Sequence, residues 1–503
     1  MSMPECYDTK FRAARGGGTE PADHVRVVAR RLGAAVEGES PFGRSTSPTT
    51  VTRSEDGGRG VPRCAPGAVP DAAGLARQAR LTQSDSTNAA RRLAARAVPQ
   101  TINWALGLTR PTLMIPGPTE LAYSVIQAMN APPTVQYDAS FDERVLEPTL
   151  LALRTVFQCR GEVFLLPGSG RTSLEAGATS VIEPGDRVVV VVAGQFGALM
   201  REILVRAGAE VTEFTVEGGR PLEVARLAAE AERVRPQAIH LVHNETSTGA
   251  TYPAEAVGQI ARGVGALFLL DTVSAIAGID VRTDEWGVDL NMTGSQKCLG
   301  APLGLGVVGV SDRAWEAMER RRTLAKSYAY DLLQWRKTWL PEARGGRLAA
   351  GAPRSQPVSI PTHLTAAMRA AVEIILAEGL RHRFARHAVA AAALRAGLDA
   401  MRLELFPDPT IASNTVTCVR TPHGIDARAV VTTMRDHYGI LVGTGLDKLR
   451  TGTLRIGTMS LTASPAYILP TLSALELALR EHGYKSEPGA GLAAAQSIFA
   501  EAS

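Results

Sequence analysis

The sequence has few of the features that mark several classes of protein. Its 503 residues include five cysteines, and these show neither a CxxC pair nor metal-ligand spacing, so we expect no disulfide framework and no metal site. The longest apolar runs, such as 188–193, have the length of a strand and fall far short of a membrane span. A net charge of +4 does not indicate a nucleic-acid partner. We therefore expect a protein of a reducing, cytoplasmic compartment, without a membrane span or a secretory signal.

The first hundred residues differ in composition from the rest. They are rich in Gly, Arg, Ala, Ser, Thr and Pro, and their aromatic residues are Tyr7, Phe11 and Phe42. Such a segment buries too little apolar surface to offset the entropy of ordering it. We predict that 1–100 is mainly a disordered extension. A transit peptide, or a start codon placed too far upstream, would give the same composition.

From residue 162 onward, short β-rich segments alternate with helix-length segments. We predict strands at 162–166, 187–192, 210–215, 238–242, 266–270, 289–293 and 305–310, with amphipathic helices at 172–182, 196–207, 222–234 and 253–264. This alternation predicts a mainly parallel sheet covered by helices on both faces. We assign 101–362 to a large α/β domain, 363–484 to a smaller C-terminal α/β domain and 485–503 to a tail.

A glycine-rich segment, Pro167-Gly-Ser-Gly-Arg-Thr-Ser173, lies between a predicted strand and a predicted helix. Small residues at a helix N-terminus let backbone N–H groups approach an anion, which the helix dipole also favours. A tight β–α turn would need the same glycines for backbone reasons alone. A dinucleotide site is less well supported, because Ser173 occupies the place of the third glycine in GxGxxG.

Two charged residues follow later strands. Asp271 comes directly after four apolar strand residues, and Lys297 lies among small and polar residues just beyond the next strand. A carboxylate at a buried strand end needs a cationic or hydrogen-bonding partner, and a lysine withdrawn from water can form an imine with a carbonyl. Each residue alone also fits an ordinary cap or a surface charge. Together with the glycine-rich segment they supply the three parts that pyridoxal phosphate requires: a phosphate cradle, a partner for the pyridine nitrogen and a Schiff-base lysine.

With these segments the sequence resembles a known family. It is similar to the class V aminotransferases, in the branch of the alanine–glyoxylate, serine–glyoxylate and (S)-ureidoglycine–glyoxylate enzymes. The resemblance covers 113–484 and implies the fold-type I (aspartate-aminotransferase-like) fold. It rests on the segments Pro116-Gly-Pro-Thr119, Gln136-Tyr-Asp138, Gly168-Ser-Gly170, Glu245-Thr-Ser-Thr-Gly249, Asp271-Thr-Val-Ser274, Gly294-Ser-Gln-Lys-Cys298 and Leu454-Arg-Ile-Gly-Thr-Met459.

The resemblance implies roles for individual residues. Lys297 would form the Schiff base and move the substrate Cα proton, and Asp271 would keep the pyridine nitrogen protonated. Arg455 would grip the substrate α-carboxylate with its planar fork, and Gln136 is a candidate contact for the donor. The other implied cofactor contacts are Phe196 and Val273 on the ring faces, Thr246 beside the ring, and Ser169, Gly170, Arg171 and Gln296 at the phosphate.

The implied activity is transamination from a small amino acid to a 2-oxo acid. Glyoxylate is the expected acceptor, and (S)-ureidoglycine, alanine and serine are the candidate donors. A homodimer with a shared active site is implied, in which Tyr328 or Tyr330 of one subunit would reach the phosphate of the other. Segment 356–361 departs from the His or aromatic residues of many relatives, which bears on the substrate pocket.

Two alternatives to transamination stay open. One is a class V lyase of the desulfurase type, which needs a mobile nucleophilic cysteine. Cys418, in a predicted strand, and Cys298, beside the lysine, do not suit that role. The other is a catalytically silent member of the fold that acts as a binding or scaffold protein.

Overall fold

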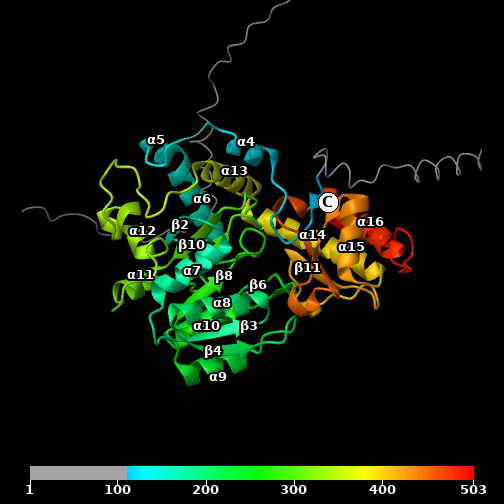
Figure 1. Cartoon of the computed structure of the whole chain (residues 1–503), viewed down its shortest axis with the longest axis horizontal. Coiled ribbons are helices and arrows are strands. Elements are labelled where there is room, and N and C mark those ends of the chain that lie inside the picture. The colour runs from blue at the N-terminus through cyan, green and yellow to red at the C-terminus, as the bar shows by residue number, and fades with distance from the viewer. Residues whose placement is uncertain (1–109, 133, 503) are drawn as a thin grey trace, which may run out of the picture. The chain divides into compact units, whose positions relative to one another are not determined.

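The structure, a computed structural model, describes residues 110–132 and 134–502 (Figure 1). The predicted extension 1–100 lies outside these residues. Within them the buried apolar side chains form two cores, one around a seven-stranded sheet and one beside a three-stranded sheet. None of the described helices is both long enough and apolar enough to cross a membrane.

The seven-stranded sheet confirms the predicted, mainly parallel architecture. Its order is β2-β10-β9-β8-β5-β3-β4, and β10 alone in this sheet runs against its two neighbours. A parallel pair needs a crossover connection, whereas the ten residues 295–304 that join β9 to β10 contain no helix. The strands are β2 (Glu162–Pro167), β3 (Arg187–Val192), β4 (Glu210–Thr215), β5 (Ala238–Val242), β8 (Leu267–Asp271), β9 (Leu290–Gly294) and β10 (Leu305–Val310).

The crossover helices cover both faces of this sheet. They are α7 (Gly170–Val181), α8 (Gln195–Ala207), α9 (Val224–Val234) and α10 (Ala254–Gly263). The connections through α7 and α8 lead across the sheet in one direction, and those through α9 and α10 lead back. Because such crossovers are right-handed, α7 and α8 lie on one face and α9 and α10 on the other. The loops that follow β2, β3, β5, β8 and β9 therefore meet at one edge of the sheet, where ligands bind in open α/β folds.

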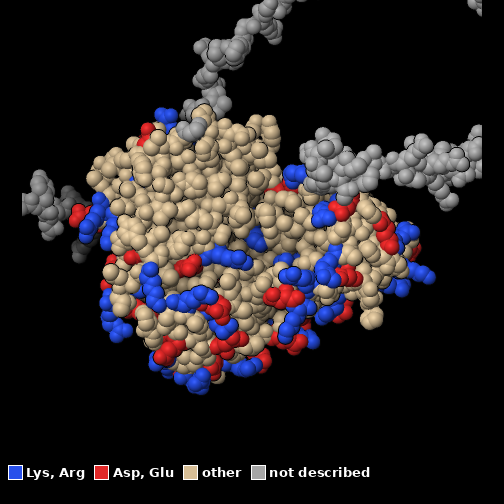
Figure 2. Space-filling model, in the orientation of Figure 1, with Lys and Arg blue, Asp and Glu red and all other residues tan. Residues whose placement is uncertain are grey.

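Further helices surround the large domain. They are α4 (Tyr123–Met129), α5 (Ala139–Phe141), the π-helical turn η1 (Asp142–Leu146), α6 (Glu147–Phe157), α11 (Asp312–Glu319), α12 (Leu332–Trp339), the 3-10 turn η2 (Glu342–Arg344) and α13 (Thr362–Glu378). Helices α4 and α6 pack against α13. Figure 2 shows few charged side chains over α4, α6 and α13. We call this surface the charge-poor face; its exposed apolar side chains include Tyr123, Ile126, Leu151 and Ile374.

The smaller domain has an antiparallel sheet of order β11-β14-β13, with β11 (Val416–Arg420), β14 (Thr453–Gly457) and β13 (Gly443–Thr444). Its helices are α14 (Leu380–Ala400), α15 (Ala427–Tyr438), α16 (Pro465–Glu481) and α17 (Ala490–Glu501), with 3-10 turns η3 (Pro409–Ile411), η4 (Asp447–Leu449) and η5 (Ser460–Thr462). Near the start of the described chain, β1 (Thr112–Leu113) pairs with β12 (Ile440–Leu441) of this domain. The domain boundary near 362 remains a proposal, to which this pairing adds that β1 joins the smaller domain.

The segment predicted as a tail, 485–503, contains α17, which packs against α14. The two helices are in close contact at Gly397 and Gly491. A methyl group built on Gly397 would lie 2.8 Å from the Gly491 carbonyl oxygen, and one on Gly491 would lie 2.9 Å from the Gly397 carbonyl oxygen. The helix backbones are therefore in direct contact at this crossing.

Candidate active site

Lys297 lies in the loop after β9, with 9% of the residue exposed. Burial lowers the pKa of its amine to about 8, and the charge of Arg455 acts in the same direction. The Nζ atom donates a hydrogen bond to the Pro116 carbonyl oxygen. A lowered pKa increases the neutral fraction of the amine near neutral pH, and the neutral amine is the form that attacks a carbonyl carbon.

The segment from Pro116 to Thr119 crosses over Lys297. Gly117 adopts a φ of +85°, and a methyl group at this position would overlap Lys297 Cδ. The Thr119 N–H donates to the Gln296 carbonyl at 3.2 Å, and its hydroxyl donates to the Met459 carbonyl at 2.8 Å. The segment thus connects the lysine loop to the chain just after β14, and Gly117 is the position where only glycine fits.

Asp271 ends β8 and is 3% exposed. Its carboxylate accepts the Val273 N–H at 2.8 Å and forms no ion pair with another described residue. Burial raises the pKa of this carboxyl to about 7; the charge of Glu245 raises it further and that of Lys297 lowers it. A protonated ring nitrogen would supply the cation that this buried acid lacks.

The N-terminus of α7 meets the loops after β8 and β9. A methyl group on Gly170 would lie 2.6 Å from Val273 Cγ2, and one on Gly294 would lie 2.7 Å from the Gly170 nitrogen and 2.8 Å from Gln296 Oε1. The first N–H groups of a helix have no partner within it and attract an anion. Among the described residues, Gln296 Oε1 is buried without a hydrogen-bond partner. The free backbone N–H groups are the donors that a phosphate needs, and the Gln296 amide, whose NH2 group can also donate, lies beside them.

Glu245, which was not predicted as a site residue, fixes the start of α8. It lies in the short hairpin of β6 (Asn244–Glu245) and β7 (Ala250–Thr251), and it is fully buried. Its carboxylate accepts the N–H groups of Phe196 at 3.1 Å and Gly197 at 3.2 Å, where the helix dipole favours an anion. Glu245 therefore sets the position of Phe196. In the sequence, Glu245 stood out only as part of the resemblance segment 245–249, which did not indicate its contact with α8.

Arg455 points from β14 towards the same edge. Burial lowers the pKa of its guanidinium, which donates to the Thr444 carbonyl at 2.8 Å and the Thr246 carbonyl at 3.4 Å. The Thr246 hydroxyl in turn donates to Ser274 Oγ at 2.8 Å. A guanidinium has five N–H donors, so these two bonds leave others for a ligand carboxylate.

Two other predicted residues have side chains without a described contact to this cluster, although the Arg171 N–H belongs to the first turn of α7. Gln136 donates to Ser359 Oγ at 3.0 Å, and the structure gives it no contact with Lys297 or Arg455 within the described chain. Arg171 is exposed on the first turn of α7. Of the two candidate tyrosines, Tyr328 is 70% exposed, and Tyr330 is partly buried against the large core.

The described residues contain no group of His, Cys, Asp or Glu arranged to hold a metal ion. Three free cysteines lie among them, at positions 159, 298 and 418. Cys298 and Cys418 are fully buried, and burial raises the pKa of their thiols to about 12 and about 11. A desulfurase requires a mobile, reactive thiolate, so these cysteines do not support the lyase alternative.

Residues 152–457 match the family model described as aminotransferase class-V. The chain is a class V aminotransferase. Enzymes of this family depend on pyridoxal phosphate, and the fold-type I prediction is confirmed.

Relatives of this aminotransferase match over most of their length. The chain is 32% identical to the (S)-ureidoglycine–glyoxylate transaminase of Bacillus subtilis (strain 168) over 410 residues, covering 78% of this chain and 96% of the relative. It is also 32% identical to the serine–glyoxylate aminotransferase of Arabidopsis thaliana over 408 residues, covering 79% and 97%. The crystal structure of the ureidoglycine–glyoxylate aminotransferase from Bacillus subtilis superposes with a TM-score of 0.73 at 33% identity, over 78% of this chain and 98% of that one.

Proposed function

We propose that this aminotransferase binds pyridoxal phosphate at the edge described above and transfers the amino group of a small amino acid to glyoxylate. One observation supports this most strongly: the buried Lys297 lies close enough to the buried Asp271 and Arg455 for both charges to act on its pKa, which is lowered. The cofactor fits the residues present. Ser169, Gly170, Arg171 and Gln296 would hold its phosphate. Phe196, Thr246, Val273 and Asp271 would surround its ring, and Lys297 would bind it covalently.

Three side chains of the site would then have distinct roles in the reaction. Bound pyridoxal phosphate would supply the sink for the electrons released at the substrate Cα. Lys297 Nζ, as a neutral amine, would remove the Cα proton and hold it for return. Asp271 would keep the proton on the ring nitrogen, and Arg455 would orient the substrate by its α-carboxylate.

Replacement of Arg455 by alanine tests the carboxylate role. We expect kcat/KM for every amino-acid donor to fall about a hundredfold, because losing one partner of a buried charge pair costs roughly 2–5 kcal/mol. Arg420→Ala is the matched control: this arginine lies on the neighbouring strand β11 and stacks on Phe406, with 4.8 Å to the ring centroid. Unchanged kcat/KM for all donors in Arg455→Ala would reject the assignment.

The donor is best identified by a screen against glyoxylate that follows the cofactor spectrum. (S)-Ureidoglycine, alanine and serine are the candidates, and relatives named for the first and the last of these are equally identical to this chain. The contact between Gln136 and Ser359 joins a segment on which the resemblance rests, 136–138, to segment 356–361, which departs from many relatives. If no donor converts the bound cofactor, the proposed activity is wrong and the silent-scaffold alternative gains support.

We also propose that the enzyme is a homodimer with a shared site. The charge-poor face supports this, because exposed apolar side chains grouped on α4, α6 and α13 are typical of a surface that a partner covers. Tyr328 and Tyr330 both remain candidates for the residue that reaches the partner's phosphate. A cytoplasmic location is likewise a proposal, supported by the free thiols at 159, 298 and 418.

Gly117→Ala tests the segment over Lys297. We expect the affinity for pyridoxal phosphate to fall about tenfold or more, because overpacking a filled site costs about 1–3 kcal/mol. The measurement is a titration of the apoprotein with the cofactor. Gly185→Ala is the control: this residue has a φ of +86° but no atom within 4 Å of an added methyl group, so it shares the backbone strain without the overlap. Equal effects in the two variants would show that backbone strain, and not contact with Lys297, is responsible.

A further inference from the structure

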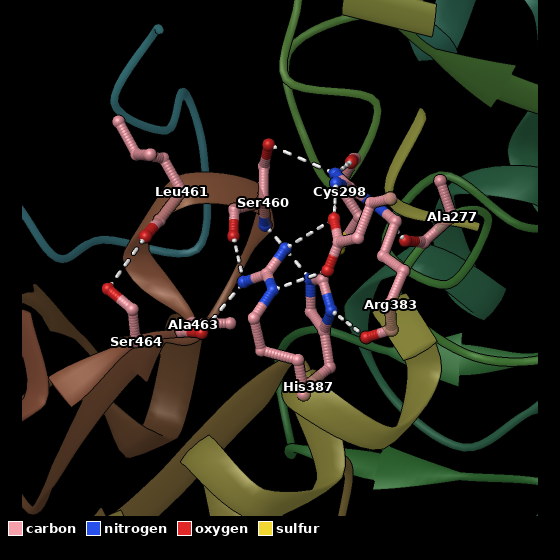
Figure 3. Close-up of polar contacts among 10 residues, drawn as sticks. Ala277, Cys298, Arg383, His387, Ser460, Leu461, Ala463 and Ser464 are labelled. Atoms are coloured by element: carbon pink, nitrogen blue, oxygen red, sulfur yellow. Dashed lines mark hydrogen bonds and ion pairs between the residues drawn. The ribbon is translucent and has the colours of Figure 1, made fainter. Parts of the chain in front are cut away.

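A pair of arginines lies between the two domains at the start of α14. Arg383, only 2% exposed, donates to the carbonyl oxygens of Ala277 at 2.8 Å and Cys298 at 2.7 Å, and to Ser460 Oγ at 3.1 Å. Its charge is balanced by Glu378 at 2.8 Å. Figure 3 shows Arg383 between Ala277 and Cys298 of the large domain and Ser460 of the smaller one.

Arg386 and His387 form further hydrogen bonds with Ser460. Arg386 donates to the carbonyl oxygens of Ser460 at 2.9 Å and Ala463 at 2.7 Å. The Ser460 N–H donates to His387 Nε2 at 3.0 Å, while Nδ1 lies 2.8 Å from the Arg383 carbonyl. Burial and the two arginines lower the pKa of His387 to about 3, so its ring stays neutral and Nε2 stays an acceptor. The N–H, carbonyl and hydroxyl of Ser460 are thus all engaged.

Two of the residues held in this way have strained backbones. Ala277 adopts a φ of +65° and Ser460 a φ of +54°, in the left-handed region that non-glycine residues rarely occupy. Such conformations persist only where the surroundings determine them strongly, and they cluster at functional sites. The hydrogen bonds from the arginines and His387 provide that determination here.

Each held residue belongs to a segment that leads to the active site. Ala277 closes the turn after Asp271, Cys298 is bonded to Lys297, and Ser460 follows the strand of Arg455. We propose that Arg383 is a positioning residue that couples the Lys297 segment to the Arg455 segment. It thereby sets the distance between the reacting amine and the bound carboxylate. The effect on substrate binding rests on the proposed function, whereas the coupling of the two segments does not depend on it.

The experiment compares Arg383→Met with Arg395→Met. Arg395 is also a largely buried arginine of α14, but it donates to the Ser413 carbonyl and to Asn414 instead of the Lys297 segment. In the full-length apoprotein, hydrogen–deuterium exchange is measured over 296–301 and 458–463. We expect Arg383→Met to raise exchange in both segments together, at least about tenfold, and Arg395→Met to leave the first segment unchanged. A lysine lacks the forked guanidinium and can replace only one of its hydrogen bonds, so exchange in Arg383→Lys should be faster than in wild type and slower than in Arg383→Met.

The second readout is kinetic and uses the holoenzyme. We expect Arg383→Met to raise the KM for glyoxylate and the inhibition constant of acetate, which offers only a carboxylate, about tenfold, with a smaller change in kcat. Thermal destabilisation without these changes, or a fall in kcat alone, would overturn the proposal, as would exchange that rises in one segment only. If Arg383→Met does not fold, the same criteria apply to Arg383→Lys. A wild type that fails to transaminate would reject the proposed function, whereas the exchange result would still decide the coupling.

Discussion

Replacement of Lys297 by alanine is expected to reduce transamination by about 10⁴-fold, the upper range for loss of a general base. The same change should remove the visible absorbance of cofactor bound to the protein through an imine. Both effects follow from the position of Nζ, which is buried, has a pKa lowered to about 8 and has no other described lysine near it to take its place. Single-turnover kinetics with the preferred donor and the absorbance spectrum of the purified protein provide the two measurements.

The control for this prediction is Lys485→Ala, which removes an exposed lysine beyond α16. It should leave the spectrum and the rate unchanged. A wild-type protein that is colourless and binds no pyridoxal phosphate would refute the central proposal. Cofactor binding by Lys297→Ala through an imine would show instead that another amine forms the bond.

Asp271→Asn is expected to lower kcat by about 10³-fold, the upper range for removing one preorganised electrostatic partner. Asparagine keeps the shape of the side chain, and its amide oxygen can still accept the Val273 N–H. It has no negative charge, however, to hold a proton on the ring nitrogen. Because burial raises the pKa of Asp271 to about 7 without the cofactor, binding of a cationic ring should lower that pKa again. Stopped-flow measurement of the half-reaction gives the rate of the chemical step.

Asp289→Asn is the control that distinguishes the loss of the charge at the site from the loss of a buried carboxylate elsewhere. Asp289 is 2% exposed, burial raises the pKa of its carboxyl, and it lies at the opposite end of β9, bonded to Ser311 and the Phe268 N–H. We expect this variant to lose thermal stability but to keep its kcat. Similar losses of kcat in the two variants would mean that Asp271 acts through the fold and not on the cofactor.

The strands of the large sheet could be predicted from the sequence because most of them are short segments rich in Val, Leu, Ile and Phe, and β4 (EVTEFT) alternates polar and apolar residues. Segments 187–192, 210–215, 238–242 and 305–310 have the predicted bounds. The antiparallel direction of β10 was not predicted, since it depends on the connection and not on the strand. Helix α14 was missed because its small and apolar residues are spread around its whole circumference, so it lacks a clear apolar stripe.

The site could be predicted only in part for a similar reason. Lys297 and Asp271 were predicted because each follows a predicted strand, whereas the role of Arg455 was implied only by the resemblance, since alone it reads as an ordinary strand arginine. Gly117 and Glu245 act through contacts with residues far away in the sequence, and no local pattern indicates such contacts. Arg383 reads in the sequence as one of several arginines near the start of a helix, and its burial becomes apparent only when the two domains are seen together.

The contact between Gly397 and Gly491 has a consequence for how this chain can vary in evolution. Since the backbones of α14 and α17 touch, a side chain at either position would push the C-terminal helix away from the helix that holds Arg383. Homologues that keep a C-terminal helix like α17 should therefore show small residues at both positions, changing together. In homologues that end before this helix, position 491 disappears, but a methyl group at position 397 would still lie 2.5 Å from Leu472 Cδ1 of α16, so a larger residue there requires a smaller one at position 472.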